Sequence, residues 1–192
     1  MNERGDLAST ADWRHEYPLA ELAAIFKEAQ LPYALIGGLA VNAWVRPRAT
    51  NDVGFVVLAR RDAIQAVEQA LLNNGFIHVR RQDSGEGSGP DFVQMYNREL
   101  GWGVDLQVAK TEYQEEIIRR AVVTSDDGIA VATPEDVVVL KLIANRSVDN
   151  KDLLNLAELP NLDWAYIERW AATWQVEDRL QEVRDLMERH PR

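Results

Sequence analysis

Two aspartates in apolar strands and a pair of adjacent glycines are the residues of this chain best placed to do chemistry. Asp52 stands before the apolar run VGFVV, and Asp105 is the one charged residue of the segment GVDLQVA. A carboxylate in such surroundings needs a partner or a function, because burial of its charge is costly. Gly37 and Gly38 lie between an apolar strand and a helical stretch, a turn whose backbone amides can hold a phosphate. Carboxylates from two strands beside such a turn indicate metal-assisted phosphoryl transfer.

Gly54 interrupts this pattern. Residues two apart on a strand point to the same side, so an acid at position 54 would join Asp52 and Asp105 as a third metal ligand. A glycine inside a strand is mildly destabilising, which makes packing a poor reason for it. Three interpretations stay open. The site is kept only for binding, or another acid replaces the missing one (Asp91 is the best candidate because it heads a neighbouring strand), or the glycine is an inactivating change in an otherwise active protein.

The composition narrows the class of protein. The chain has 192 residues, of which 46% are hydrophobic and 27% charged, as in soluble globular proteins. It has no cysteine and only three, widely spaced histidines, which excludes disulfides and thiolate chemistry and argues against a histidine metal site or a Ser-His-Asp triad. No apolar run is long enough to span a membrane, so we expect a cytoplasmic protein without a membrane partner.

The charge of the chain is unevenly distributed. A net charge of −10 argues against a broad nucleic-acid-binding surface. Residues 46–81, however, contain six arginines and only three acids. This locally basic region could contact phosphate, or its arginines could be solvated loop ends.

The spacing of apolar residues predicts strands and helices that alternate, followed by helices alone. Predicted strands cover 33–36, 52–58, 76–80, 91–96 and 103–109. Predicted helices cover 18–29, 39–45, 61–74, 111–121, a segment that starts at 134, and 149–158, 163–174 and 176–189. The helix at 134 has the clearest start, because Thr133 can cap it and Pro134 suits its first position.

The expected fold class is α+β, a small mixed β-sheet flanked by helices with a helical C-terminal part. We divide the chain into a flexible N-terminus at 1–14, an α/β core at 15–132 and a helical subdomain at 133–192.

The stretch IGGLAVNAWVRPRATNDVGFVV, residues 36–57, resembles the signature of polymerase-beta-like nucleotidyltransferases. In that signature Gly-Gly or Gly-Ser is followed by Asp-apolar-Asp at the head of the next strand, and Gly54 departs from it. The spacing of Arg48 and Asp52 resembles the abortive-infection branch, which includes toxins of toxin–antitoxin systems.

A second stretch, LKLIANRSVDNKDLLNL, is similar to a helical motif of the same branch. That motif carries a lysine, an arginine and two aspartates, and the matching residues here are Lys141, Arg146, Asp149 and Asp152. The motif usually has a lysine directly before its first aspartate, where this chain has Val148.

The resemblance implies a toxin-like enzyme that transfers a nucleotide from a nucleoside triphosphate (NTP) to a hydroxyl of RNA, such as tRNA, or of protein. Asp52 and Asp105 would bind Mg²⁺ or Mn²⁺, Asp105 would also be the base for the acceptor hydroxyl, and Lys141 would contact phosphate. The residues implied in nucleotide binding are Gly37, Gly38, Arg46, Arg48 and Lys141. An antitoxin could be a partner.

Several of these residues also have structural interpretations. Arg146, Asp149 and Asp152 could form an ion-pair cluster that fixes the helical part, and Lys141 could extend to solvent at a helix edge. Two other functions stay open: a catalytically dead pseudoenzyme that binds a nucleotide or a partner, and a transferase for an aminoglycoside-type small molecule. The negative net charge would suit the cationic substrate of the latter.

Overall fold

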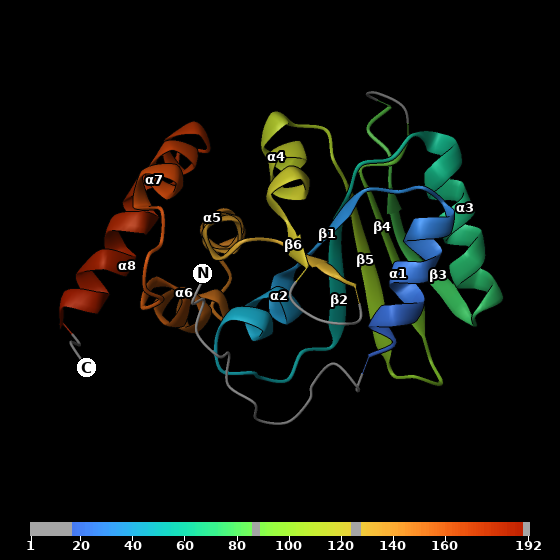
Figure 1. Cartoon of the computed structure of the whole chain (residues 1–192), viewed down its shortest axis with the longest axis horizontal. Helices are drawn as coiled ribbons and strands as arrows, with labels where there is room; N and C mark the ends of the chain where they lie inside the picture. Colours follow the sequence, from blue (N-terminus) through green and yellow to red (C-terminus); the bar gives the residue numbers. More distant parts are fainter. Residues whose placement is uncertain (1–16, 86–88, 124–127, 190–192) are drawn as a thin grey trace, which may run out of the picture.

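The computed structural model describes residues 17–85, 89–123 and 128–189. These residues form a seven-stranded sheet in the order β3-β4-β5-β2-β1-β7-β6 (Figure 1). The strands are β1 (Tyr33–Ile36), β2 (Asp52–Val57), β3 (Phe76–Gln82), β4 (Phe92–Asn97), β5 (Trp102–Val108), β6 (Val122–Val123) and β7 (Ala130–Val131). β2 pairs in parallel with β5, and β1 with β7, whereas the other neighbouring strands are antiparallel. The sheet is therefore mixed, as predicted.

Strand β2 lies at the centre of the sheet. Phe55, Val56 and Val57 are fully buried, which explains why this run is apolar without alternation. β4 alternates instead: Val93 and Met95 are buried, while Phe92, Gln94 and Tyr96 are half-buried. One face of β4 thus packs against the core, and the other face stays partly accessible.

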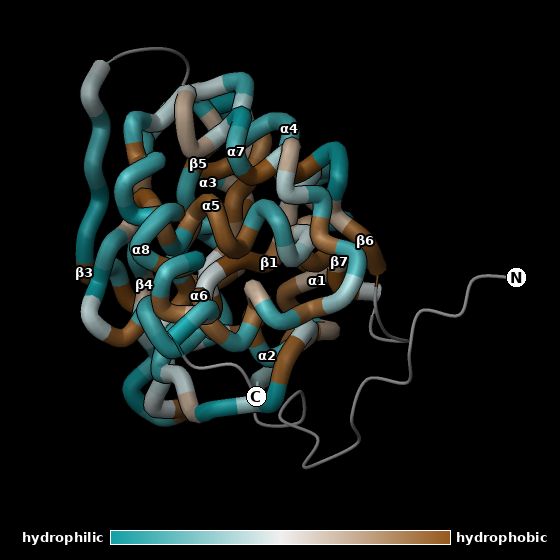
Figure 2. The backbone as a smooth tube through the Cα atoms, turned by 90° about the vertical axis from the view of Figure 1, so that its left-hand side faces the viewer, coloured by the Kyte–Doolittle hydropathy of each residue, from teal (hydrophilic) through white to brown (hydrophobic). Residues whose placement is uncertain are grey.

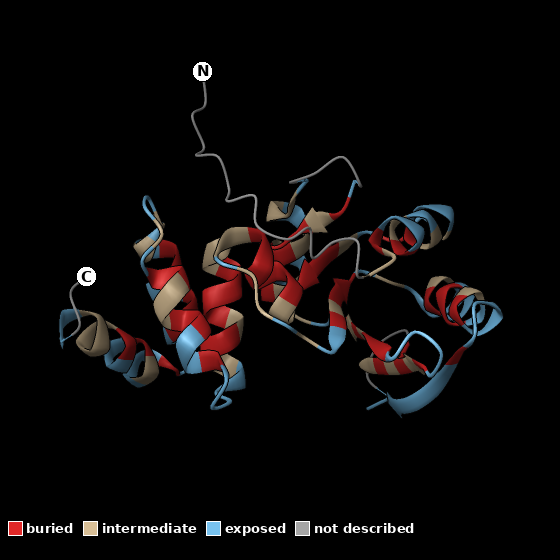
Figure 3. Ribbon diagram, turned by 90° about the horizontal axis from the view of Figure 1, so that it is seen from below, coloured by how far each residue is buried: buried red, intermediate tan, exposed pale blue. Residues whose placement is uncertain are grey.

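Helices cover both sides of the sheet. They are α1 (Leu19–Glu28), α2 (Gly37–Trp44), α3 (Arg61–Asn73), α4 (Glu112–Arg120), α5 (Pro134–Ala144), α6 (Asp149–Ala157), α7 (Trp164–Thr173) and α8 (Glu177–Arg189). Figure 1 shows α1 and α3 on one side and α2, α4 and α5 on the other. α5 packs against α2 and also against α6 and α7, so it joins the sheet to the C-terminal helices. Figure 3 shows buried residues concentrated where the helices face the sheet and one another.

The start of α5 is built as its sequence predicts. Thr133 accepts a hydrogen bond from the backbone N–H of Asp136, and Pro134 is in the first turn. Asp136 is itself fully buried, and its carboxylate accepts hydrogen bonds from Tyr166 of α7 at 2.5 Å and from Arg120 of α4 at 3.3 Å. One carboxylate therefore connects three helices.

Strand β3 forms one edge of the sheet. Apart from Phe76 its residues are exposed, Ile77 and Val79 among them, and Figure 2 shows the strand at the rim of the molecule. The residue register shifts between His78 and Arg80, a β-bulge of the kind that discourages edge-to-edge pairing.

The fold class is confirmed, and the predicted strand at 33–36 coincides with β1. β6 and β7 were not predicted, because two residues each are too few to show a periodic pattern. The predicted N-terminal segment 1–14 lies outside the described residues, and the boundary at 132/133 stays a prediction. No helix among the described residues is long and apolar enough to span a membrane.

Candidate functional site

The parallel register of β2 and β5 brings Asp52 and Asp105 to the same face of the sheet. Gly54 is paired with Asp105, and Asp52 with Gly103. Because side chains alternate along a strand, the two carboxylates lie on adjacent strands with an offset of two residues. A Cβ atom at position 103 would lie only 3.3 Å from Oδ1 of Asp52, so Gly103 leaves room for this carboxylate.

Asp105 is held from its other side by Gln94 of β4. The Nε2 atom of Gln94 donates a hydrogen bond of 2.9 Å to Oδ1 of Asp105. The pKa of Asp105 is raised above its ordinary value, mainly because of burial and also because of the negative charge of Asp52. The hydrogen bond from Gln94 and the charge of Arg146 act in the opposite direction. A cation between Asp52 and Asp105 would relieve their mutual repulsion.

The two glycines lie directly beside these strands. β1 ends at Ile36, the residue paired with Gly54, and α2 begins at the next residue. Gly37 has φ +71°, a conformation that other residues rarely adopt. A Cβ atom on Gly38 would lie 2.7 Å from Oγ1 of Thr50, so this glycine lets α2 approach the segment before Asp52. The start of α2 therefore lies next to the acidic pair.

Position 54 has room for a side chain. A Cβ atom there would lie 3.4 Å from Cγ1 of Ile36 and 3.6 Å from its carbonyl oxygen, which are ordinary contacts. Packing alone thus does not require a glycine at this position.

The donor set fits one divalent cation better than two. Within the described ranges, no three His, Asp or Glu side chains are grouped so that they could hold a metal ion. Magnesium is commonly bound by one or two carboxylates together with substrate phosphates, and Asp52 and Asp105 meet that requirement. A second ion would need the carboxylate that position 54 lacks.

Asp91 does not lie where a replacement acid would have to be. It precedes β4, its backbone carbonyl accepts a hydrogen bond from Val108, and its carboxylate accepts hydrogen bonds from Ser84 at 2.6 and 3.0 Å. The antiparallel register places Gln94 opposite Asp105. The expectation that Asp91 supplies the missing carboxylate does not fit this geometry.

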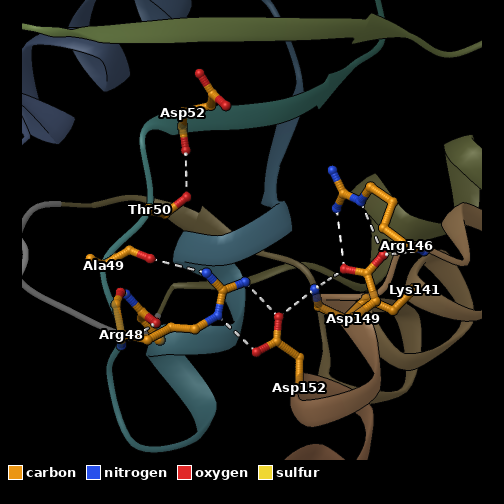
Figure 4. A network of polar contacts seen from close by, with 9 residues as sticks. Arg48, Ala49, Thr50, Asp52, Lys141, Arg146, Asp149 and Asp152 are labelled. Carbon is orange, nitrogen blue, oxygen red and sulfur yellow. Dashed lines mark hydrogen bonds and ion pairs between the residues drawn. The ribbon is translucent and has the colours of Figure 1, made fainter.

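Lys141 lies in a buried ion-pair network (Figure 4). Its side chain is 3% exposed, and its Nζ atom lies 2.8 Å from Oδ1 of Asp149 and 2.7 Å from Oδ2 of Asp152. The lysine therefore does not extend to solvent, and the anionic partners that its apolar helix requires are these two carboxylates. Its predicted contact with phosphate stays a prediction.

Arg48 and Arg146 complete this network from two directions. Arg48, from the loop before β2, binds both oxygens of Asp152, and Arg146 binds Asp149. Burial opposes ionisation of the two aspartates, but the hydrogen bonds from Arg146, Arg48 and Lys141 outweigh it and lower the pKa of both. An ion-pair cluster that fixes the helical part, the structural interpretation of Arg146, Asp149 and Asp152, thus accounts for these contacts.

Arg146 differs from the other two cations in its exposure. Its side chain is 64% exposed, and it is close enough to Asp105 to lower the pKa of that residue. Figure 4 shows its guanidinium on the side of the network that faces β2. Arg46 is also exposed, in the loop before β2, and its predicted role in nucleotide binding stays a prediction.

Sequence reasoning did not find Gln94 and Thr50. The signal for Gln94 was its place among the apolar and aromatic residues of FVQMYN, but only strand pairing shows that it faces Asp105.

Comparisons with solved structures agree with this architecture. The antibiotic-resistance factor ANT(2″)-Ia matches 94% of this chain and 100% of its own, with a TM-score of 0.58 and 14% identity. An antigenic nucleotidyltransferase-like protein from Paracoccidioides brasiliensis matches 92% of this chain and 94% of its own, with a TM-score of 0.51 and 17% identity. The lincosamide antibiotic adenylyltransferase LnuA matches 80% of this chain and 99% of its own, with a TM-score of 0.50 and 14% identity.

The chain therefore has the fold of these nucleotidyltransferase structures, as predicted, and its place in the polymerase-beta-like superfamily stays a prediction. No protein-family model matches the sequence, and no curated protein matches it. These neighbours do not specify the abortive-infection branch.

Proposed function

We propose that this protein binds an NTP with one divalent cation and transfers its nucleotide to a hydroxyl acceptor. The observation that carries this proposal is the position of Asp52 and Asp105 on one face of adjacent strands, beside the Gly37–Gly38 turn. A phosphate-binding turn and a pair of carboxylates are both needed for this chemistry, and the fold brings them together.

Each part of the site has a role in the proposed reaction. Asp52 and Asp105 would hold the Mg²⁺ or Mn²⁺ ion, which offsets negative charge on the triphosphate when it is bound. Backbone amides at the start of α2 would bind the triphosphate. Asp105 would take the proton of the acceptor hydroxyl as its oxygen bonds to the α-phosphorus and the bond to pyrophosphate breaks.

Arg146 is the cation that we assign to the phosphates of the bound nucleotide. Its side chain is 64% exposed and its charge acts on Asp105, whereas the nitrogen of Lys141 is enclosed by two carboxylates. Lys141 would then act indirectly, by holding Asp149 so that Arg146 is kept in place.

An RNA or protein hydroxyl is the acceptor that we favour. On the accessible face of β3, β4 and β5, the register places Arg80, Gln94 and Tyr96 near Asp105, which is the one carboxylate of that face. A cationic amino sugar would need carboxylates beyond those engaged by the metal. The antibiotic-modifying neighbours nevertheless make such an acceptor the alternative to test.

The assignment to toxin-like enzymes with an antitoxin partner rests on the sequence motifs around Arg48 and Lys141 alone. A second candidate function is nucleotide or partner binding without transfer. Gly54 favours it, because the loss of a metal ligand should cost several kcal/mol of transition-state stabilisation.

Incubation with α-labelled NTPs, Mg²⁺ and separate pools of tRNA, protein and aminoglycosides tests these functions. We expect label transfer to tRNA or protein by the parent chain and its loss in Asp52→Ala, while Asp62→Asn, an exposed residue of α3, retains it. Transfer only to aminoglycosides would contradict the acceptor class. If neither the parent nor Gly54→Asp transfers label, yet the parent binds an NTP, the binding function replaces the proposed one.

A further inference from the structure

Gln94 lies at the centre of a row of residues that crosses the sheet. Register pairs connect Gly54 with Asp105, Asp105 with Gln94, and Gln94 with Arg80. Asp105 therefore has a glycine, without a side chain, on one side and Gln94 on the other. Of its two lateral neighbours, only Gln94 can restrain its carboxylate.

The hydrogen bond from Gln94 fixes one oxygen of that carboxylate. Nε2 of Gln94 donates to Oδ1 of Asp105 at 2.9 Å, and both side chains are only partly accessible. A carboxylate turns easily about its terminal bond, and a donor on one oxygen limits this rotation. Oδ2 is then available for a cation or for the proton of an acceptor hydroxyl.

A neutral amide is the side chain best suited to this position. A carboxylate at 94 would add a third negative charge and accept rather than donate a hydrogen bond. An arginine or lysine would neutralise Asp105 and compete with a metal ion for it. Glutamine orients the carboxylate and leaves the double negative charge of Asp52 and Asp105 intact.

We infer that Gln94 is a positioning residue, which holds Asp105 in the orientation that binds the divalent cation at a site where Gly54 provides no third ligand. This inference rests on the proposed function of Asp52 and Asp105. Groups that orient metal ligands typically change metal affinity or activity by about tenfold to a hundredfold when they are removed.

The test replaces Gln94 by methionine, which has similar length but no donor. Gln107 lies on the same face two residues from Asp105, so Gln107→Met is the matched control. Titration calorimetry with Mn²⁺ and a non-hydrolysable ATP or GTP analogue measures cation affinity, and initial rates give kcat and KM. We expect Gln94→Met to weaken Mn²⁺ binding and lower kcat by about tenfold or more, with the KM for NTP and the Gln107→Met control little changed.

A double-mutant cycle separates positioning from general stability. In an Asp105→Asn background, Gln94→Met should cause no further loss of Mn²⁺ affinity, because the group that it positions is already changed. Equal losses in both backgrounds, or no loss relative to Gln107→Met, would overturn the inference.

The same measurements distinguish the failure of this inference from failure of the proposed function. Mn²⁺ binding that depends on Asp52 and on Gln94, without transfer to any acceptor, would uphold the positioning role and reject the transferase. Nucleotide transfer and Asp52-dependent Mn²⁺ binding that do not change in Gln94→Met would uphold the transferase and reject the positioning role of Gln94. If the parent binds no Mn²⁺ in the presence of either analogue, both are rejected.

Discussion

Arg48 and Asp152, 104 residues apart in the sequence, form a two-point ion pair, with Nε 2.8 Å from Oδ1 and Nη2 2.6 Å from Oδ2. The same carboxylate lies 2.7 Å from Nζ of Lys141. The loop that leads into β2 is thereby fixed to α5 and α6. This network helps to determine where the strand that carries Asp52 lies relative to the C-terminal helices.

Substitution of Asp152 should strongly destabilise the protein. Asp152→Asn leaves the buried ammonium of Lys141 with one carboxylate and Arg48 without its partner, and removal of one partner of a buried pair typically costs about 3–5 kcal/mol. Urea unfolding measures this change in the free energy of unfolding. Asp62→Asn breaks the exposed pair with Arg60 and should cost at most about 1 kcal/mol. Similar losses in the two variants would show that the network contributes little.

The network should also make stability depend on pH. The pKa values of Asp149 and Asp152 are lower in the folded protein than the ordinary value of 3.8. Their contribution is therefore complete above that value and is lost as the pH falls through the lower, folded pKa values. We expect the free energy of unfolding to fall in acid, and to fall less steeply in Asp152→Asn.

Asp136 acts in the opposite sense. Burial raises its pKa, against the hydrogen bonds from Tyr166, Thr133 and Arg120, so its protonation favours the folded state. Comparison of the parent with Asp152→Asn cancels the contribution of Asp136 to the pH dependence of stability, because Asp136 is present in both proteins. Parallel pH profiles would contradict the assignment to the network.

Gly54→Asp should restore a third carboxylate without disrupting β2. The Cβ atom fits beside Ile36, so we expect the variant to fold. Three acids repel one another without metal, so Mg²⁺ should stabilise Gly54→Asp more than it stabilises the parent or the uncharged control Gly54→Asn. Thermal unfolding with and without Mg²⁺ measures this difference. Equal Mg²⁺ effects in all three proteins would place position 54 outside the metal site.

Arg146 and Lys141 should respond differently to substitution. Arg146→Ala removes an exposed cation, and we expect NTP affinity to fall by about tenfold or more, because a hydrogen bond to a charged group contributes about 1.5–3 kcal/mol. Lys141→Met leaves two buried carboxylates without their shared cation, so its main effect should be a lower free energy of unfolding. Equilibrium binding of a fluorescent NTP at a temperature where both variants are folded separates the two effects. A greater loss of affinity in Lys141→Met would favour its direct contact with phosphate.

Tyr166→Phe should weaken the junction of α4, α5 and α7. It removes the hydroxyl that donates to Asp136 at 2.5 Å, and a buried acceptor that loses its donor costs about 1–3 kcal/mol. Tyr96→Phe, on the half-buried face of β4, serves as the control and should be nearly neutral. Chemical unfolding of both variants checks this prediction, which an equal effect would contradict.

The sequence was sufficient for features that depend on neighbouring residues. Helix and strand identity follow from periodicity over one segment, and the capping of α5 by Thr133 depends on residues three positions apart. The turn between β1 and α2 was recognisable for the same reason, because Gly37 and Gly38 are adjacent in the sequence and Gly37 adopts a positive φ.

Only the tertiary structure decided which distant side chains meet. The parallel register of β2 and β5 sets Asp105 beside Gly54, and the antiparallel register of β4 chooses Gln94 rather than Asp91 as its neighbour. The sequence predicted that Lys141 contacts phosphate or extends to solvent, and only the packing of α6 beside α5 shows that it is a buried partner of Asp149 and Asp152. Local patterns determine the elements, whereas register and helix packing are settled by burial across the whole chain, which a single segment cannot reveal.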